Sequence, residues 1–261
     1  MSTPLTDGIN ALTQYANEIT GKQDTTLSDA VGSLVEGYGG GSDDGHIVSN
    51  ALSLKEMFYT NEETINHKPE LPEKMEFDLP YCSSIHSFFR QYLHYGQYTL
   101  NVKEITLKTY YPCDCTQAFY RNKSIKTINI PDGLIIRNDN NMFSDSIIEV
   151  INGIISYTDT ASINTGAFAN AYNLIEVRFA ENNIHNSHTY GSAVLSEESL
   201  ISIANGLDGS VSGKTLKLHQ TSRANCSAIT GTNDNGTFIA NPNGTLTLAD
   251  FITTVKGWTL V

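Results

Sequence analysis

The sequence predicts an α+β protein in which a solenoid of short parallel strands lies between a helical N-terminal arm and a C-terminal cap of helices and strands. Three observations support this fold class: apolar residues at helical spacing near the N-terminus, an internal repeat in the middle, and helix-capping signals near the C-terminus. They divide the chain into a helical arm at 1–41, a linker and N-terminal cap at 42–75, repeats at 76–194 and a C-terminal cap at 195–261.

The start of the chain carries one apolar stripe. Its members follow one another at steps of 4, 3, 4 and 3: Leu5, Ile9, Leu12, Ala16 and Ile19. This spacing places them on one face of a helix and is typical of a short coiled-coil seam. Because two heptads are too short to be stable alone, the stripe needs a partner surface.

A second helix is predicted from Thr26, whose capping-box pattern with Asp29 precedes an amphipathic stretch. Gly39–Gly41 end this helix and begin a flexible Gly-Gly-Gly-Ser-Asp-Asp stretch. The two helices either pack on the main domain or form an oligomerising and docking arm. The flexible stretch favours the arm, and we therefore expect a homo-oligomer.

An internal repeat occupies the middle of the chain. Phe119 is followed six positions later by Ile125, and Phe168 is followed six positions later by Leu174. Further apolar residues stand nine and eleven positions after each phenylalanine, and Phe143 begins a similar phrase with a shorter connection. Each unit is expected to be one strand joined to a turn that inserts its phenylalanine over the strands.

The predicted strand starts are Val102, Ile125, Ile147 and Leu174, which follow one another at steps of 23, 22 and 27. These periods are inside the range of leucine-rich repeats, about 20 to 29 residues. One repeat cannot bury its own phenylalanine, so neighbours must stack and caps must close both ends.

The C-terminal cap is predicted from helix signals. Ser196 opens a helix that ends near Gly206, and its apolar face holds Leu200, Ile203, Ala204 and Leu207. A strand follows at 215–219. Thr247 and Asp250 form a second capping pair, Phe251, Ile252 and Val255 form an apolar face, and Gly257 ends the helix before a final segment at 258–261. We expect this alternation of strand and helix to continue the solenoid with longer units.

The repeated Ala-Phe-x-x-Asn-x-x-Leu-x-x-Val-like phrase resembles the BspA-type leucine-rich repeats of bacterial and prophage surface proteins. The resemblance covers roughly residues 75–179. It departs from the pattern in a long connection between Phe88-Phe89 and Val102, and in irregular turns around Asn138 to Asn141.

The two ends of the chain resemble tail or baseplate-associated structural proteins of phages that infect Gram-positive gut bacteria. The N-terminal resemblance lies in residues 19–31 and the following Gly-Tyr-Gly-Gly-Gly, and the C-terminal one in residues 195–207 and 257–260. It implies that residues 1–41 attach to other virion or tail proteins while the solenoid contacts a host surface protein or glycan. It also implies a virion location, after assembly in the bacterial cytoplasm and release by lysis.

The composition limits which classes of binding partner are expected. A formal net charge of −12 disfavours nucleic acid, because phosphate binding relies on Lys and Arg. No basic and apolar leader stands at the N-terminus, so no secretory signal is expected, and no run of 18 apolar residues predicts membrane insertion. The four cysteines are too few for a disulfide scaffold and are expected to be reduced.

Three clusters contain residue types that could support chemistry. His185 and His188 could share a metal, Cys113 and Cys115 could form a bridge or bind a soft metal, and the 138–141 segment with Asp145 resembles a calcium loop. Each has a structural interpretation that we favour: a polar loop between repeats and cap, small packed side chains, and a repeat turn. Since no nucleophile signature or phosphate loop is present, the sequence predicts no catalytic, metal or cofactor site and therefore no enzyme.

Aromatic residues are the candidate binding patch: Tyr92, Tyr95, Tyr98, Tyr110 and Tyr111. We expect part of these and the neighbouring tyrosines to pack in the core or its shell and the rest to line an exposed surface. Tyrosine offers a flat apolar body and a hydroxyl, which suit both sugars and protein surfaces. Two alternatives stay open. A bacterial cell-surface leucine-rich-repeat adhesin would normally need a signal peptide or wall anchor, and a repeat-bearing enzyme or inhibitor would need a deep pocket with convergent carboxylates.

Overall fold

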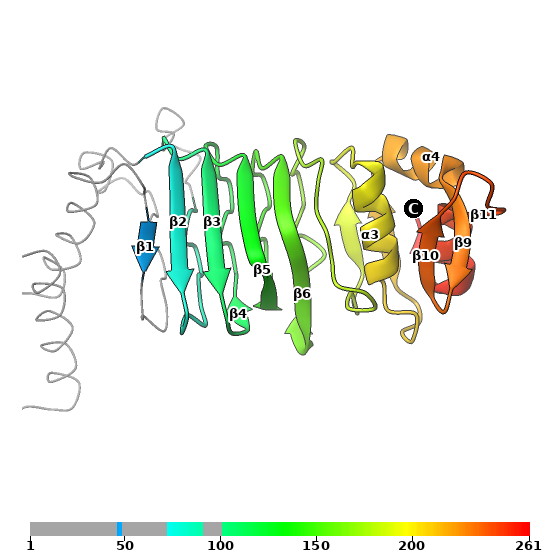
Figure 1. Cartoon of the computed structure of the whole chain (residues 1–261), viewed down its shortest axis with the longest axis horizontal. Helices are drawn as coiled ribbons and strands as arrows, with labels where there is room; N and C mark the ends of the chain where they lie inside the picture. The colour runs from blue at the N-terminus through cyan, green and yellow to red at the C-terminus, as the bar shows by residue number, and fades with distance from the viewer. Residues whose placement is uncertain (1–45, 49–71, 91–100) are drawn as a thin grey trace, which may run out of the picture.

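A computed structural model describes residues 46–48, 72–90 and 101–261 (Figure 1). The predicted arm at 1–41 and the tyrosines at 92, 95 and 98 lie outside the described residues. In the described part the chain advances steadily along the long axis of the molecule, from the strands near residue 74 to the helices and hairpin of the C-terminal region. We call each strand with its following turn a coil.

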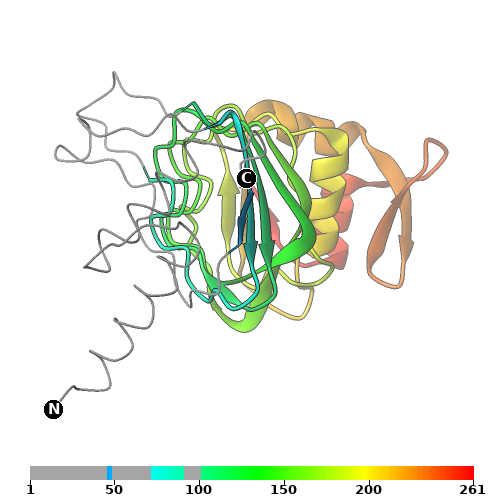
Figure 2. The ribbon, with the colours of Figure 1, turned by 60° about the vertical axis from the view of Figure 1, so that its left-hand side comes forward.

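The coils share a parallel sheet. Its members are β1 (His46–Val48), β2 (Lys74–Leu79), β3 (Glu104–Thr109), β4 (Cys113–Asp114), β5 (Thr127–Asn138) and β6 (Val150–Ser162). The order is β1-β2-β3-β5-β4, with β6 also paired to β5, and every pairing is parallel. Viewed nearly along the stack, successive coils lie over one another (Figure 2).

Alternating side chains explain why these segments form strands with one buried face. In β3, Ile105, Leu107 and Thr109 are buried, whereas Glu104 and Lys108 are only partly buried. Successive side chains of a strand point to opposite faces, so this alternation places one row in the core and the other on the outside of the sheet. The same alternation in β2 makes the core continuous from coil to coil.

Strand register confirms the repeat but corrects one position. Glu104 pairs with Thr127, Thr127 pairs with Val150, and Val150 bridges to Glu176, so these four residues hold equivalent places in successive coils. Ile125 precedes Thr127 by two positions, and the residue that precedes Val150 by two positions is Ile148, which is fully buried. The predicted assignment to Ile147 was therefore wrong by one position. The connection after Phe143 was predicted to be two positions shorter than the connection after Phe119. In the structure it is shorter by one position.

The predicted phenylalanines form a ladder through the core. Phe119, Phe143 and Phe168 are all buried, which confirms their predicted role as equivalent inserted side chains. Their ring centroids lie 5.5 Å and 5.1 Å apart in stacked pairs, and Phe89 extends the ladder at 6.0 Å from Phe119. Each ring thus covers the ring of the neighbouring coil.

In the turns opposite the sheet, successive backbone amides donate alternately within their own coil and to the next coil. The amide of Ala118 donates within its own coil to Cys115 O (3.0 Å), and the amide of Phe119 donates across to Met142 O (2.9 Å). The next two residues repeat this pattern, within the coil and then across. The turns therefore satisfy their backbone amides while binding one coil to the next.

Left-handed residues recur at equivalent places in these turns. Gln117 and Arg121 have φ of 53° and 58°, and Asn141 and Asp145, one coil later, have φ of 52° and 59°. This conformation is uncommon outside glycine, and Asn and Asp adopt it most readily among the other residues. The predicted repeat turn at 138–141 is thereby confirmed.

The C-terminal region contains the predicted helix and a second parallel sheet. Helix α3 (Glu197–Gly206) is capped by Ser196, which accepts from the Ser199 amide, and buries the predicted apolar face. The sheet joins β7 (His188–Tyr190), β8 (Thr215–Leu218) and β12 (Thr259–Leu260). Thr247 caps α5 (Leu248–Asp250), which runs into η3 (Phe251–Val255), and Gly257 has φ of +69°. These signals were predicted correctly.

Two elements of the C-terminal region depart from a simple continuation of the coils. Helix α4 (Gln220–Ala228) was not predicted, and β9 (Thr230–Asp234) forms an antiparallel hairpin with β10 (Thr237–Ala240) that β11 (Leu246–Thr247) joins. An Asn-Gly pair at the hairpin tip is the sequence signal that could have revealed the turn. The hairpin projects beyond α3 (Figure 2).

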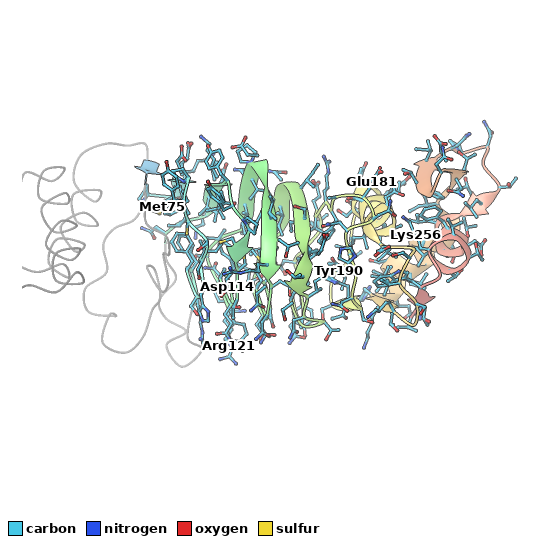
Figure 3. All side chains as sticks on the ribbon, turned by 90° about the horizontal axis from the view of Figure 1, so that it is seen from below. Met75, Asp114, Arg121, Glu181, Tyr190 and Lys256 are labelled. Carbon is cyan, nitrogen blue, oxygen red and sulfur yellow. The ribbon has the colours of Figure 1, made fainter. Side chains whose placement is uncertain are left out.

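Lys256 ties this region together from inside. It is 2% exposed, and its Nζ donates to Asn182 Oδ1 (2.6 Å) and to Asn205 O (3.2 Å), near the end of α3 (Figure 3). Burial lowers the pKa of Lys256. The two oxygen acceptors and the negative end of the helix dipole offset this cost and make Lys256 a cap for α3.

The close approach of β5 and β6 gives a test of the stack. A Cβ added at Gly153 would lie 2.2 Å from Ile130 O, and the glycine has φ of +121°. We expect Gly153→Ala to lower the free energy of unfolding by about 3 kcal/mol, because the backbones must separate. Denaturant titration of the purified protein measures this change.

Gly213→Ala is the matched control, since Gly213 also has a positive φ, +68°, but no atom within 4 Å of its added Cβ. It should cost only about 1 kcal/mol. Equal losses in the two variants would show that backbone contact between the coils is not what constrains this position.

Candidate functional site

The outer face of the sheet carries a row of polar side chains that bond to one another across strands. Lys74 and Glu104 form an ion pair of 2.8 Å, Asn129 Nδ2 donates to Glu104 (2.9 Å), and Asn152 Nδ2 donates to Asn129 (2.8 Å). Parallel register creates the row, because outward positions of successive coils fall side by side. The row gives the sheet a polar, self-bonded surface.

A second ion pair lies nearer the carboxyl ends of the strands. Lys108 Nζ contacts Glu76 Oε1 at 2.5 Å, with both side chains about one third exposed (29% and 36%). The hydrogen bond to Glu76 is the main cause that raises the pKa of Lys108, and neighbouring Asp78 and Tyr110 act in the same direction. Surface pairs of this kind add little to stability, so their groups can exchange partners for those of a ligand.

The predicted tyrosines that the structure describes follow Lys108 by two and three positions. Tyr110 and Tyr111 follow β3 directly and are 52% and 51% exposed. Their flat side chains thus stand at the surface, as the sequence led us to expect for a binding patch. The other three predicted tyrosines fall outside the described residues.

Tyr81 joins them and was missed in the sequence. Leu79 pairs with Thr109 and Ser84 with Asp114 at the same offset along the chain, so Tyr81 lies opposite Tyr111 in the neighbouring coil. Its side chain is 53% exposed. Extending the repeat alignment upstream, where Pro-Tyr-Cys precedes the next coil's Tyr-Tyr-Pro-Cys, would have found it.

Two isoleucines extend the exposed apolar surface across the next coils. Ile135 in β5 is 38% exposed, and Ile154 in β6 is 53% exposed. Register places Ile154 at the level of Tyr110 and Ile135 one position beyond the level of Tyr111, near where β2 and β3 end. Half of the large apolar side chains that stand exposed in the described chain therefore lie at about one level of successive coils. We call this set the edge patch: Tyr81, Tyr110, Tyr111, Ile135 and Ile154.

A buried polar network joins the large sheet to the second one. Tyr157 OH donates to Asp139 Oδ2 (2.9 Å) and lies 3.3 Å from His188 Nε2, while the Asn164 amide donates to Asp139 Oδ1 (2.6 Å). Burial raises the pKa of Asp139 to about 6 and lowers the pKa of His188 to about 4. At neutral pH His188 is therefore uncharged, whereas Asp139 stays mainly ionised and takes up its proton as the pH falls to about 6.

This network resembles catalytic chemistry only in its residue types. Asp139, Tyr157 and His188 are 1%, 4% and 2% exposed, so no substrate reaches them in this conformation. The predicted polar loop at His185 and His188 was wrong for His188, which is a buried part of β7. His185 instead pairs with Asp208 at 2.9 Å. Among the described residues, no cluster of three or more metal-binding side chains is found.

The cysteines pack as small apolar residues, as predicted. Cys82, Cys113, Cys115 and Cys226 are buried free thiols. A hydrogen bond with Cys115, together with burial, raises the pKa of Cys113 well above its usual range, and burial raises the pKa of Cys226 to about 12. Such thiols are protonated and poor nucleophiles at neutral pH.

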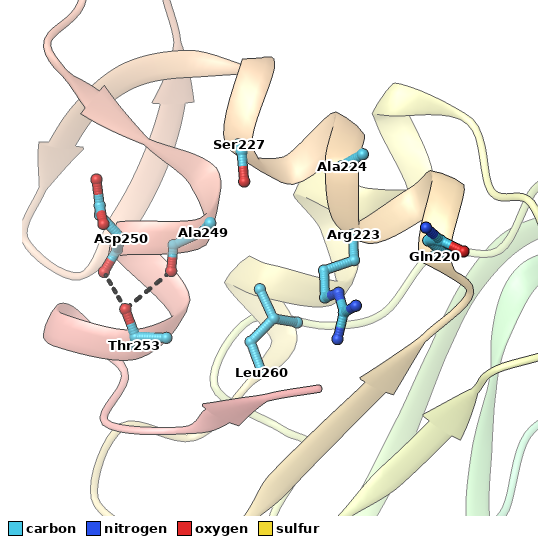
Figure 4. A pocket seen from close by; sticks show the side chains of 8 residues that line it. All are labelled: Gln220, Arg223, Ala224, Ser227, Ala249, Asp250, Thr253 and Leu260. Atoms are coloured by element: carbon cyan, nitrogen blue, oxygen red, sulfur yellow. Dashed lines mark hydrogen bonds between the residues drawn. The ribbon is translucent and has the colours of Figure 1, made fainter.

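An open groove lies between α4 and the final helical turns (Figure 4). It has a volume of about 480 Å³, and its lining residues are Gln220, Arg223, Ala224, Ser227, Ala249, Asp250, Thr253 and Leu260. The Asp250 carboxylate already accepts from Thr247 Oγ1 (2.7 Å) in the helix cap, and Thr253 Oγ1 donates to backbone carbonyls. The groove therefore contains a cationic side chain, Arg223, but no base hydrogen-bonded to a nucleophile.

Comparison with protein-family models, with curated proteins and with solved structures finds no match for this chain. In the part of the chain that the structure describes, no helix has the length and apolar character needed to cross a bilayer.

The buried network gives a pH test with opposite signs. Asp139, whose pKa rises from 3.8 to about 6 on folding, contributes stability that is present below pH 3.8 and lost as the pH rises to 6. His188, whose pKa falls from 6.5 to about 4, contributes stability that is lost as the pH falls from 6.5 to 4. Between pH 4 and 6 the two contributions oppose each other.

Removing one of the two groups should leave only the pH dependence of the other. Relative to wild type, the free energy of unfolding of Asp139→Asn should rise between pH 4 and 6, and that of His188→Gln should fall over the same range. Chemical denaturation at a series of pH values measures both differences. Two variants that run parallel to wild type across this range would contradict the assigned protonation states.

Proposed function

We propose that this chain is a non-enzymatic, phage or prophage tail or baseplate-associated structural protein that presents a BspA-like leucine-rich-repeat solenoid for binding to a host surface. The edge patch is the single observation that carries the binding part of the proposal. Exposed aromatic and aliphatic side chains that gather at one level of successive coils commonly mark an interaction site. No described cluster combines an accessible nucleophile, a base and an orienting partner, so binding is the activity the geometry favours.

The repeat class is supported by two regularities. Equivalent strand positions recur at a nearly constant interval, from Glu104 to Thr127, Val150 and Glu176, and one phenylalanine per coil joins a continuous ladder. Both are expected when each unit covers the apolar face of the next. They agree with the repeat period that the BspA-like resemblance rests on.

The assembly part of the proposal rests on the resemblance of the chain's ends to phage tail proteins. Residues 1–41 would attach the protein to other virion proteins and promote a homo-oligomer, with the solenoid projecting outward. Several copies on one particle would raise the apparent affinity of a weak individual contact, because later contacts become intramolecular. The protein would reach its location in the virion by assembly in the host cytoplasm and lysis.

Adsorption to host cells tests the proposal. Full-length protein labelled at its N-terminal amine is incubated with a panel of Gram-positive gut bacteria, and the cell-bound fraction is measured. We expect binding to susceptible cells, and we expect the triple variant Tyr81→Ala, Tyr110→Ala, Tyr111→Ala to lose it by about tenfold or more, since exposed aromatic side chains dominate such contacts.

The matched control removes an equal number of exposed apolar side chains elsewhere: Tyr172→Ala, Ile175→Ala, Val194→Ala, at positions 68%, 47% and 45% exposed. This variant should bind like wild type. If wild type binds no cells, or if both triple variants bind equally well, the edge patch does not mediate host contact and the proposal fails.

A further inference from the structure

The edge patch has an order that a scattered apolar surface would lack. Tyr81 and Tyr111 face each other on neighbouring coils, and Tyr110 stands beside them opposite Pro80. Neighbouring strands lie about 4.8 Å apart. Aromatic groups thus recur at the strand spacing, which is similar to the rise of one sugar in an extended β-linked glycan.

Hydrogen-bonding groups lie next to these rings. Lys108 joins Glu76 at 2.5 Å, pairs in register with Asp78 of β2 and precedes Tyr110 by two positions. Carboxylates accept hydrogen bonds from hydroxyls, and an ammonium donates to hydroxyl oxygens. A sugar stacked on Tyr110 would therefore find both donors and acceptors at its edge.

Charge selects the kind of glycan. Two carboxylates, Glu76 and Asp78, accompany one ammonium at this place, and the whole chain carries a formal net charge of −12. An anionic polymer would be repelled by this balance. A neutral glycan carries no such penalty.

The same groups argue against a protein partner. The cores of protein interfaces are depleted of charged residues, because such residues lose their water when they are covered. Here Lys108, one member of a charged pair, stands only two positions before Tyr110. Sugar hydroxyls can replace the water around Lys108 and Glu76, whereas an apolar protein surface cannot.

We propose that the edge patch binds a neutral glycan, whose sugar rings stack on Tyr81, Tyr110 and Tyr111 and whose hydroxyls bond to Glu76, Asp78 and Lys108. This inference rests on the proposed function in one respect, since both assign binding to the same surface. The glycan runs across the coils, so that successive sugars meet successive tyrosines. Ile135 and Ile154 extend the apolar floor under the chain.

Affinity electrophoresis of the full-length protein tests this inference. The native gels contain mannan, dextran, hydroxyethyl cellulose or glycol chitin, with dextran sulfate as the anionic counterpart of dextran. We expect at least one uncharged polysaccharide to retard the protein and dextran sulfate not to. Retardation should persist at high salt, because a neutral ligand is not screened.

Variants then locate the site. Tyr110→Ala should weaken the binding about tenfold, while Tyr110→Phe, which keeps the ring, should stay within about threefold of wild type. Tyr172→Ala is the control, because Tyr172 is 68% exposed outside the patch, and it should bind like wild type. Circular dichroism before each gel shows that the variants are folded.

Three results would overturn the inference: no retardation by any neutral polysaccharide, retardation by dextran sulfate alone, or equal weakening by Tyr110→Ala and Tyr172→Ala. These differ from failure of the proposed function. If adsorption to cells depends on the three tyrosines but no neutral glycan binds, only the glycan inference is refuted. If a neutral glycan binds but the protein adsorbs to no cells, only the proposed host-surface role is refuted.

Discussion

The phenylalanine of each coil depends on its neighbours for burial, and most other features of the fold serve that contact. A single strand and turn has too little surface to cover its own ring, so Phe143 lies between Phe119 and Phe168 at 5.5 Å and 5.1 Å. The spacing of the rings must match the spacing of the strands. The close backbone approach at Gly153 and the amides that donate across the turns both hold the coils at that distance.

This regular stacking also forms the candidate binding surface. Once register is fixed by the core, the outward side chains of successive coils fall into rows without further contacts to place them. Tyr81 comes opposite Tyr111 for this reason, and the Lys108–Glu76 pair comes beside Tyr110. Because the core sets this register, a ligand meets backbone positions that are already ordered, which lowers the entropy that the contact must overcome.

Sequence patterns predicted what depends on local chemistry and missed what depends on packing. The repeat period, the ladder at Phe119 and the caps at Ser196 and Thr247 all follow from residue types at short spacing, and the structure has them. The equivalence of Ile148 depends on the exact length of one turn, which periodicity alone does not resolve. The burial of His188 depends on Tyr157, 31 positions away in the chain, and no local pattern reveals that contact.

A double-mutant cycle between Phe119 and Phe143 tests most directly whether the ladder couples the coils. The free energy of unfolding is measured for wild type, Phe119→Leu, Phe143→Leu and the double variant, with Phe119→Leu and Phe251→Leu as a distant pair. Stacked rings in contact should give a coupling energy of about 1 kcal/mol, while the distant pair should be additive within about 0.5 kcal/mol. Additive losses for Phe119 and Phe143 would mean that the two rings stabilise the protein independently of each other, and would contradict this account of the fold.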